Sequence, residues 1–300
     1  MWRHFLNRIN LLPYDILNLV FVSFLLFLSL VFKPKLPQDN SLIATYIGLI
    51  FFVILASFFP FDFRKRLTFI HLFYPFILIP IVFESLGKLI IYINPHFWDA
   101  TLASLDKAFC GQYPCLLLKQ YANPLLTEIL QLAYTSYYFM PPILAIMLFL
   151  KRDKRLATVA FGIILGFYAS YIGYLFFPAL GPRFYLDPPD GIYKGTHLAK
   201  HIASFLDAVE KNKTDAFPSG HTQISIMCTY YAQILGPKWA VIYGVLTALL
   251  IISTIYCHYH YLADVIAGVF LAAICLRIAP SLEARFKGFS DQIAHFFSSY

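Results

Sequence analysis

Long apolar runs separated by short polar stretches recur along the whole chain. Each run is close to the ~20 residues that a helix needs to cross a bilayer. The runs lie at about 14–32, 41–59, 67–92, 125–150, 156–178, 219–236, 239–257 and 260–279. This pattern predicts an all-α fold, a polytopic membrane bundle of about eight transmembrane helices.

Composition agrees with a membrane protein. Hydrophobic residues make up 59% of the 300 residues, and charged residues make up only 13%. A soluble domain of this length cannot cover its surface with so few charges. The first apolar run has no small-residue cleavage site and leads into Lys33-Pro34-Lys35, so we interpret it as a retained anchor. We expect a single integral membrane domain over residues 1–300.

The distribution of Lys and Arg predicts the orientation. With the N-terminus inside, short cytoplasmic segments hold 13 of the 23 basic residues, and the longer outer loops hold nine. This positive-inside bias places both termini in the cytoplasm and makes the runs at 219–236 and 260–279 begin at the same outer face. We expect a bacterial inner-membrane protein whose active site faces the periplasm. The net charge of +7 follows from this topology and gives no case for a nucleic-acid partner.

Three segments outside the runs have patterns of their own. The connector 93–124 has apolar residues at helical spacing and is expected to lie in the membrane interface as an amphipathic helix. The outer loop 179–217 is broken by prolines, but from about 197 to 209 it has helical periodicity and is placed to cap a site. The tail 280–300 is expected to form a short amphipathic cytoplasmic helix. The catalytic core is then expected at about 125–279.

The sequence Phe217-Pro218-Ser219-Gly220-His221 opens one apolar run. Proline suits a first helical turn, and glycine lets the backbone approach a ligand closely. Free N–H groups and the helix dipole at such an end favour an anion such as phosphate. We therefore expect Ser219 and Gly220 to bind phosphate and His221 to reach the leaving group. A Pro-Ser N-cap followed by an interfacial histidine is the simpler alternative.

His260 and Asp264 open the last apolar run. Because residues four apart share a helix face, the carboxylate can accept a hydrogen bond from one ring nitrogen and leave the other as a nucleophile or base. Asp264 is also an ionisable group in an apolar run, which needs a partner. Two alternatives stay open: a buried pair that serves packing alone, and a metal site formed together with His258 and His221.

Taken together, the two motifs resemble the type-2 phosphatidic acid phosphatase superfamily, whose second signature is Pro-Ser-Gly-His and whose third ends in His-x-x-x-Asp. The resemblance covers about residues 160–275. It implies that His260 is the nucleophile that forms a phosphohistidine, that Asp264 orients it and that His221 is the general acid. It also implies phosphate binding by Ser219 and Gly220, with no metal or organic cofactor.

The chain departs from the superfamily signatures at two basic positions. The third signature usually has Ser-Arg six to seven residues before the nucleophilic histidine, where this chain has Ser253 and Thr254. The first signature is absent as well, and its nearest counterpart is the segment 178–183, which ends in Arg183. We expect Arg183 to supply the missing positive charge through a bidentate phosphate contact.

The loss of these arginines is similar to the branch that contains inositol phosphorylceramide synthases and sphingomyelin synthases. The stretch from Trp98 to Asp106, with Phe109 and Gly111, also resembles bacterial members of that branch. The resemblance implies a lipid substrate and an inositolphosphotransferase-like reaction with an alcohol as acceptor. A plain lipid phosphate phosphatase, with water as acceptor, is the alternative. A proton-coupled transporter and an inactive scaffold are the alternatives from other classes.

Two further pairs of residues have open roles. Glu84 and Lys88 are four residues apart in the third run and are expected to form an ion pair, with a place facing the catalytic pocket as the alternative. Cys110 and Cys115 flank a short outer-loop sequence and could form a disulfide in an oxidising compartment. The simpler interpretation is that the two cysteines stay as separate thiols and form no disulfide.

Overall fold

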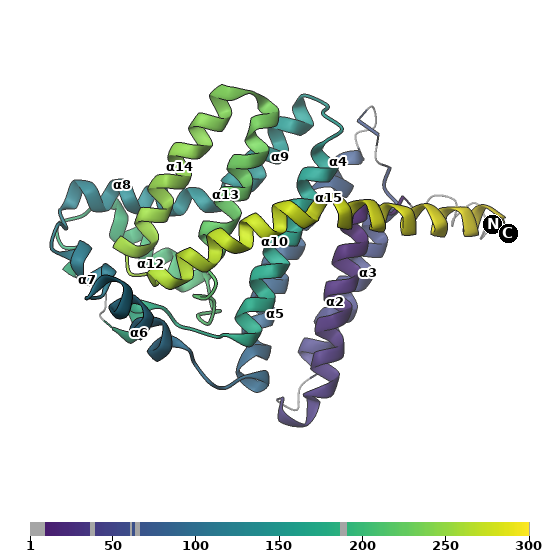
Figure 1. The fold of residues 1–300 in the computed structure, drawn as a ribbon. Coiled ribbons are helices and arrows are strands. Elements are labelled where there is room, and N and C mark those ends of the chain that lie inside the picture. The colour runs from purple at the N-terminus through teal and green to yellow at the C-terminus, as the bar shows by residue number, and fades with distance from the viewer. Residues whose placement is uncertain (1–9, 37–39, 61, 64–66, 187–190, 300) are drawn as a thin grey trace.

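The computed structural model describes residues 10–36, 40–60, 62–63, 67–186 and 191–299 of the chain. Within these ranges every regular element is a helix, so the all-α prediction is confirmed (Figure 1). The elements are α2 (Pro13–Val31), η1 (Lys33–Lys35), α3 (Ser41–Ser57), α4 (Thr68–Phe73), α5 (Pro75–Ile93), α6 (Asp99–Cys110), α7 (Pro114–Lys119), α8 (Pro124–Thr135), η2 (Ser136–Tyr138), α9 (Met140–Leu150), α10 (Leu156–Phe176), α11 (Pro182–Tyr185), α12 (Leu198–Val209), α13 (Gly220–Ala232), η4 (Gln233–Leu235), α14 (Pro237–Tyr256) and α15 (Leu262–Ser299).

The number of helices that can cross a membrane is smaller than the number of apolar runs. Five helices in the described ranges are long and apolar enough, namely α2, the continuous stretch Thr68–Ile93, α10, α14 and α15. The pair formed by α8 with η2 and by α9 makes a sixth if it is one bent span. Helix α3 has 17 residues, and α13 has only 13, with polar side chains in its first turns. The count of eight therefore stays a prediction.

The bend between α8 and α9 has a local cause. The two helices meet at an angle of 53°. Pro141 and Pro142 lie in the first turn of α9, and they lack the N–H groups that would continue the hydrogen bonds of the preceding helix. The bend leaves the residues just before it, Tyr134 to Tyr138, at the side of α13.

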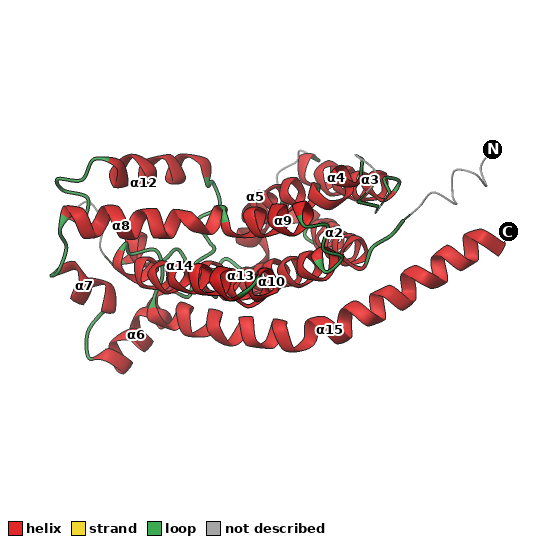
Figure 2. Ribbon diagram, turned by 90° about the horizontal axis from the view of Figure 1, so that it is seen from above, coloured by secondary structure: helices red, strands yellow, loops and turns green. Residues whose placement is uncertain are grey.

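Helix α13 lies inside the bundle. It packs against α9, α10, α14 and α15, while α2 is packed on α10 and α15 and α3 covers α2 from the other side (Figures 1 and 2). The first residues of α13 therefore begin in a fully enclosed place, where the side chains from Gly220 to Ser225 are buried. The short helices α6 and α7 lie beside the beginning of α15 and the end of α14.

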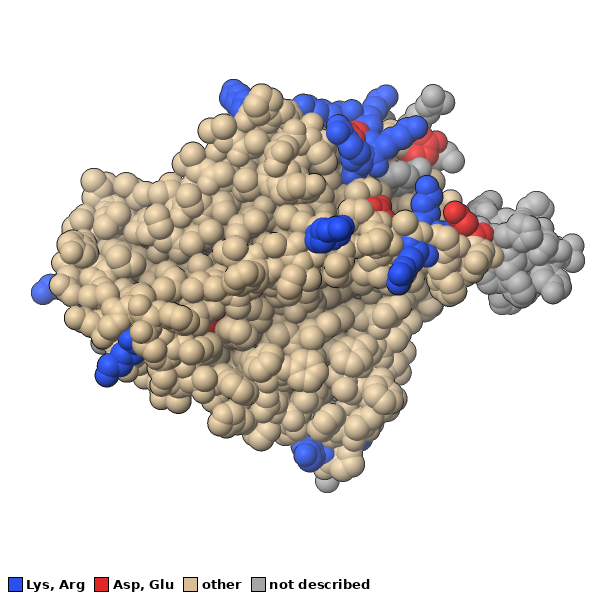
Figure 3. Space-filling view, in the orientation of Figure 1, with Lys and Arg blue, Asp and Glu red and all other residues tan. Residues whose placement is uncertain are grey.

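The C-terminal segment differs from the prediction. Residues 280–299 do not form a separate short helix, because α15 continues without a break from Leu262 to Ser299 with Pro280 inside it (Figure 2). The segment around Pro280 is rich in good helix formers such as Leu, Glu, Ala and Arg, which offset the one lost hydrogen bond. Lys and Arg gather near the second half of α15 and the α9–α10 connection (Figure 3). This clustering fits the positive-inside pattern, and the orientation itself stays a prediction.

A buried polar network fastens α2 to α4 and α5. The Asp15 carboxylate accepts hydrogen bonds from the Leu12 backbone N–H at 2.7 Å and from the Tyr74 hydroxyl at 2.6 Å. Its Oδ2 atom also lies 2.8 Å from Nε2 of His71, whose Nδ1 lies 2.8 Å from the Phe59 carbonyl oxygen. Asp15 and His71 are completely buried. Every polar atom in this network has a partner, which is what makes such a group tolerable in an apolar interior.

Replacement of Asp15 by Ala should destabilise the protein strongly. The change leaves His71 and Tyr74 buried without an acceptor, and breaking a buried pair in this way costs about 3–5 kcal/mol. We expect a marked fall in the melting temperature of the purified protein in detergent. The matched control is Asp153→Ala in the α9–α10 connection, whose partner Arg155 is exposed. Equal melting temperatures for the two variants would show that the network does not hold α2 in place.

Candidate active site

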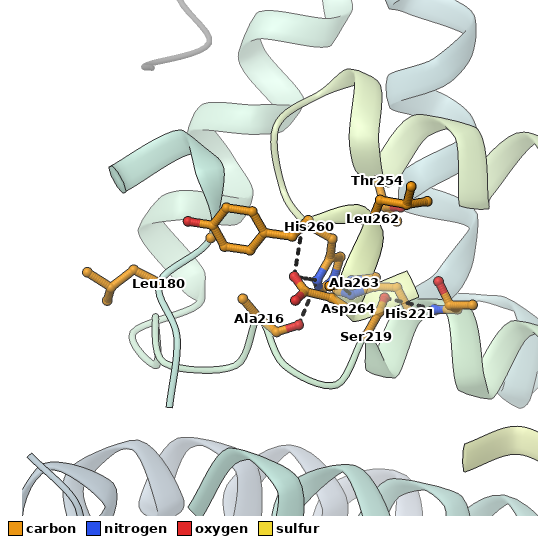
Figure 4. A network of polar contacts seen from close by, with 12 residues as sticks. Leu180, Ala216, Ser219, His221, Thr254, His260, Leu262, Ala263 and Asp264 are labelled. Carbon is orange, nitrogen blue, oxygen red and sulfur yellow. Dashed lines mark hydrogen bonds and ion pairs between the residues drawn. The ribbon is translucent and has the colours of Figure 1, made fainter. Parts of the chain in front are cut away.

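The two histidines of the sequence motifs lie in direct contact. His221 is in the first turn of α13, and His260 lies in the turn between α14 and α15. Nε2 of His260 is 3.3 Å from Nδ1 of His221, and the two residues are 3% and 7% exposed (Figure 4). The structure thus brings together two side chains that are 39 positions apart in the sequence.

The contacts of His260 determine which of its nitrogens is available. Nδ1 lies 2.8 Å from the Ala216 carbonyl oxygen and 3.4 Å from Oδ2 of Asp264. Both partners are acceptors, so Nδ1 carries the proton and the lone pair is on Nε2, which points toward His221. Burial lowers the pKa of His260 to about 4, and the ring is therefore neutral near pH 7. Sequence reasoning named Asp264 as the orienting group and missed the Ala216 carbonyl, which is closer.

Asp264 also has a structural task. Its carboxylate accepts a hydrogen bond from the Tyr261 backbone N–H at 2.8 Å, and its own carbonyl oxygen accepts one from the Ser219 backbone N–H at 3.0 Å. The residue thus caps the start of α15 and ties that start to the beginning of α13 (Figure 4). The distance of 3.4 Å to His260 is long for a hydrogen bond but short enough for electrostatic orientation.

The beginning of α13 is built for close approach. The Ser219 hydroxyl oxygen accepts a hydrogen bond from the Thr222 backbone N–H, so Ser219 is the N-cap of α13, as the simpler interpretation of the motif states. A methyl group on Gly220 would lie 2.4 Å from the Tyr174 hydroxyl, and one on Gly268 would lie 2.6 Å from the Ser219 carbonyl oxygen. Glycine is required at both places because no side chain fits. The Ser219 hydroxyl proton is not used by the cap and can be donated to a phosphate oxygen.

Arg183 lies beside the turn that carries His260. Its backbone N–H donates to the His258 carbonyl oxygen at 2.9 Å, and its guanidinium carbon is 4.6 Å from the centre of the Tyr259 ring. Nη1 donates to Asp207 at 2.7 Å, while Nε is buried and has no partner among the described residues. Arg183 therefore lies beside the turn that carries His260, and its Nη1 is already paired with the Asp207 carboxylate.

Thr254 occupies the position where the superfamily signature has arginine, and it cannot do that residue's work. Its side chain is completely buried and donates a hydrogen bond to the Ile251 carbonyl oxygen within α14. Its backbone carbonyl accepts from the N–H groups of Tyr259 and His260 at 2.9 Å and 3.0 Å. The position thus supports the His260 turn and offers no charge to a phosphate.

Tyrosine rings enclose His221. The Tyr134 ring is stacked on the His221 ring with centroids 4.5 Å apart, and the Tyr137 ring lies at 4.1 Å. Tyr134 is stacked in turn on Tyr259 at 3.9 Å. The sequence could not point to these residues, since the chain has 21 tyrosines and spacing alone cannot select those near the site. Their cluster just before the Pro141-Pro142 bend was the one available signal.

Two carboxylates of α6 hold the catalytic turns in place. Asp106 accepts hydrogen bonds from the backbone N–H groups of Leu262 and Ala263, both at 2.9 Å, at the first turn of α15. Asp99 accepts from the Gly181 backbone N–H at 2.9 Å and from the Tyr261 hydroxyl at 2.9 Å. Both aspartates are almost completely buried. The sequence suggested an interfacial helix in this segment but not the role of its carboxylates.

An apolar cavity of about 390 Å³ ends at His221. Its walls come from α5, α9 and α10, and it continues along α10 from Tyr174 down to Leu156. Glu84 lines this cavity and accepts a hydrogen bond from the Lys211 backbone N–H at 3.2 Å. Among the described salt bridges none joins Glu84 to Lys88, so Glu84 faces the pocket, as the alternative interpretation states, and the expected ion pair is wrong.

Two other interpretations of the sequence can be compared with the structure. In the described part of the chain no three His, Cys, Asp or Glu side chains are arranged to hold a metal ion, so the geometry does not support His258 as a third ligand. No disulfide joins Cys110 to Cys115, since Cys110 is exposed and Cys115 is buried.

Comparison with known protein families matches residues 100–278, more than half of the chain, to the PAP2 superfamily. The chain belongs to the PAP2 superfamily. The apolar helices α2, α5, α10, α14 and α15 fit a membrane-embedded protein. The PAP2 match begins within α6 and includes both histidine motifs, so it extends further toward the N-terminus than the predicted range of 160–275.

One similar protein is a PA-phosphatase related-family protein of Dictyostelium discoideum. It is 24% identical over 235 residues, which is 66% of this PAP2 chain and 43% of the relative. The chain thus spans less than half the length of that relative. No solved structure matches the chain. The match is to the PAP2 superfamily as a whole, and the narrower resemblance to inositol phosphorylceramide synthases stays a prediction.

Replacement of Asp106 by Asn should move the start of α15 and with it the turn that carries His260, and should therefore slow any turnover of a lipid phosphate at this site. The amide offers one acceptor oxygen in place of two, and a hydrogen bond to a charged group is worth about 1.5–3 kcal/mol. We expect kcat for a lipid phosphate to fall about 10- to 100-fold with little change in KM, because Asp106 positions the catalytic turn and does not touch substrate. Ser104→Ala on the exposed face of the same helix is the control. A rise in KM with unchanged kcat would assign Asp106 to binding instead.

Proposed function

We propose that this protein is a lipid phosphotransferase that works through a covalent phosphohistidine at His260. The observation that carries the proposal is the lone pair of His260 Nε2, which points toward His221 at the end of a lipid-sized apolar cavity. The reaction is inositolphosphotransferase-like: a phosphoryl-headgroup unit passes from one lipid alcohol to another. This specificity is supported by the apolar cavity that ends at His221, which suits a lipid alcohol, and by the tyrosine rings packed on the His221 ring.

In the first step Nε2 of His260 attacks phosphorus with its lone pair, and the bond from phosphorus to the lipid oxygen breaks. The bound phosphate anion stabilises the imidazolium form of His221, which donates one proton to the leaving oxygen and becomes neutral. The positive charge that appears on the phosphorylated ring is stabilised through Nδ1–H by the Ala216 carbonyl and by Asp264. Arg183 and Ser219 are the donors proposed for the phosphate oxygens.

In the second step the acceptor hydroxyl gives its proton to His221, its oxygen attacks phosphorus and the nitrogen–phosphorus bond breaks. His260 then recovers its neutral form. The contact of 3.3 Å between the two rings must open for this chemistry, since a near-attack distance of about 3–3.5 Å on the nucleophile side alone leaves no space for phosphorus between them. The substrate therefore replaces the contact between His260 and His221.

The covalent intermediate provides the direct test. Purified protein is incubated briefly with a lipid phosphate labelled with radioactive phosphorus, and the protein-bound label is tested for the acid lability and alkali stability of phosphohistidine. We expect label in the native protein and in the His201→Ala control, whose histidine is exposed on α12, and none in His260→Ala. Absence of label and of turnover in the native protein, over a broad lipid panel, would favour the scaffold or transporter alternatives.

The same preparation distinguishes transfer from hydrolysis. Labelled lipid is supplied with and without diacylglycerol or inositol as acceptor. We expect His260-dependent transfer of the label to the acceptor, which gives a new lipid with diacylglycerol or a soluble inositol phosphate with inositol, with little free phosphate. Free phosphate formed at the same rate without an acceptor would instead make the protein a plain lipid phosphate phosphatase.

The pH profile should report the state of His260. The ring attacks only when Nε2 is unprotonated, and burial lowers its pKa to about 4. We therefore expect the protonation of His260 to have no effect on kcat/KM above about pH 5. As the pH drops through 4 the ring becomes protonated, and kcat/KM should fall. An acid limb near the ordinary histidine value of about 6.5 would show that the ring is solvated in the working enzyme.

A further inference from the structure

The cavity that ends at His221 has an unusual polar end. Most of its lining is apolar, as expected for a lipid chain, but carboxylates gather where it reaches the histidine. The polar groups of this end are Glu84, Glu210, Asp215, His221, Tyr137, Tyr138, Tyr171 and Tyr174. None of the described residues that line the cavity is Lys or Arg. This end is therefore unsuited to the phosphate itself, which needs cations or N–H donors.

Glu84 and Glu210 are each held by a contact that leaves acceptor capacity unused, and Asp215 lies beside the segment that holds His260. Glu84 Oε1 accepts from the Lys211 backbone N–H at 3.2 Å, and Glu210 Oε1 accepts a short hydrogen bond from the Tyr138 hydroxyl. Asp215 directly precedes Ala216, whose carbonyl oxygen holds His260. A carboxylate has about four lone-pair sites on its two oxygens, so one contact does not satisfy it.

An independent feature points to a ligand group at this end of the cavity. His221 lines the cavity, is only 7% exposed, and its Nε2 has no hydrogen-bond partner among the described residues. A buried ring nitrogen without a partner is uncommon in a folded protein and usually marks a functional site. The oxygen that His221 protonates in the proposed reaction lies here, so the carboxylates face the neighbouring atoms of the same lipid.

We propose that Glu84, Glu210 and Asp215 form a subsite for hydrogen-bond donors on the lipid alcohol, next to the oxygen that is bonded to phosphorus. This inference rests on the proposed function, because it assumes that the lipid alcohol is the leaving group or acceptor at His221. The chemistry that fits is a hydroxyl, an amide N–H or an ammonium group close to the reacting oxygen. A glycerol backbone with two esters places carbonyl acceptors against the carboxylates and fits poorly.

The charge balance of the site agrees with this subsite. Burial, followed by the charge of Glu210, raises the pKa of Asp215 to about 6, so the two carboxylates repel each other when both are ionised. A donor or a cation placed between them relieves that repulsion. An additional acceptor or anion increases it.

The test compares lipids that differ in the groups beside the reacting oxygen; ceramide 1-phosphate and phosphatidic acid both have two chains and form the closest pair, while sphingosine 1-phosphate has one chain and an ammonium group. Turnover of ceramide 1-phosphate, sphingosine 1-phosphate and phosphatidic acid is measured with native protein and with Asp215→Asn and Glu210→Gln. We expect the native protein to prefer the two donor-bearing lipids in kcat/KM, and each variant to reduce that preference about 10- to 100-fold, the worth of one hydrogen bond to a charged group. Glu283→Gln is the matched control, because Glu283 is a half-buried carboxylate of α15 that accepts a hydrogen bond from Thr158 and lies outside the cavity lining.

The two donor-bearing lipids distinguish the sources of the donor. A preference for sphingosine 1-phosphate over ceramide 1-phosphate identifies the ammonium group, and the reverse identifies the amide N–H. Equal kcat/KM for all three lipids in the native protein, or variants that keep the native preference, would overturn the subsite.

A binding experiment keeps this inference separate from the proposed function. The melting temperature of native protein and of the three variants is measured with ceramide and with 1,2-diacylglycerol, which contain no phosphorus. We expect ceramide to raise the melting temperature more than diacylglycerol in native protein and in Glu283→Gln, and this difference to shrink in Asp215→Asn and Glu210→Gln. If no lipid phosphate is turned over but this difference is present, the reaction is wrong and the subsite stands. If turnover is present without the difference, the subsite is wrong.

Discussion

The structure depends on the close approach of the first turn of α13 to the first turn of α15. Gly268 permits it, since a methyl group at this position would lie 2.6 Å from the Ser219 carbonyl oxygen. Gly220 serves the neighbouring contact of α13 with α10, where a methyl group would lie 2.4 Å from the Tyr174 hydroxyl. The backbone hydrogen bond from Ser219 to Asp264 fixes the distance between the two turns. Because His221 lies in the first turn of α13 and His260 lies just before α15, the same contact helps to set the 3.3 Å between the two rings. If the two helices packed slightly further apart, both motifs would still be present in the sequence, but His221 and His260 would no longer be in contact.

Buried carboxylates do most of the fastening around this contact. Asp106 binds the backbone of the first turn of α15, Asp99 binds the turn before Arg183, and Asp15 holds α2 to α4 and α5. Each accepts hydrogen bonds from groups that would otherwise be unsatisfied in an apolar interior, where such bonds are costly to leave unmade. Helix ends are the natural targets, because their first N–H groups have no partner within the helix. The charged residues of this chain are few, and several of them serve as such connectors.

The environment of the two histidines separates two kinds of recognition. Beside the His260 turn lies Arg183, and the N-terminus of α13 lies between the two histidines; both suit an anion. On the side of His221 lie tyrosine rings, carboxylates and the apolar cavity, which suit a lipid chain with polar donors at its head. Phosphorus at the boundary between these two regions would be in contact with the nucleophile on one side and with the proton donor on the other. In the proposed reaction the phosphate oxygens would therefore face Arg183, and the lipid chain would face the apolar cavity.

The sequence by itself determined the all-helical class, the membrane-embedded character and the two motifs that carry the chemistry. These follow from local signals: apolar runs of sufficient length, the Pro-Ser-Gly turn and the i,i+4 spacing of His260 and Asp264. Only the tertiary structure decided the partner of His260 Nδ1, the enclosure of His221 by Tyr134 and Tyr137, and the pairing of Arg183 with Asp207. These contacts join segments that are distant in the chain, and a backbone carbonyl such as that of Ala216 has no residue signature at all. The same limit applies to the number of spans, because the bend at Pro141 and the short length of α13 depend on how the helices pack.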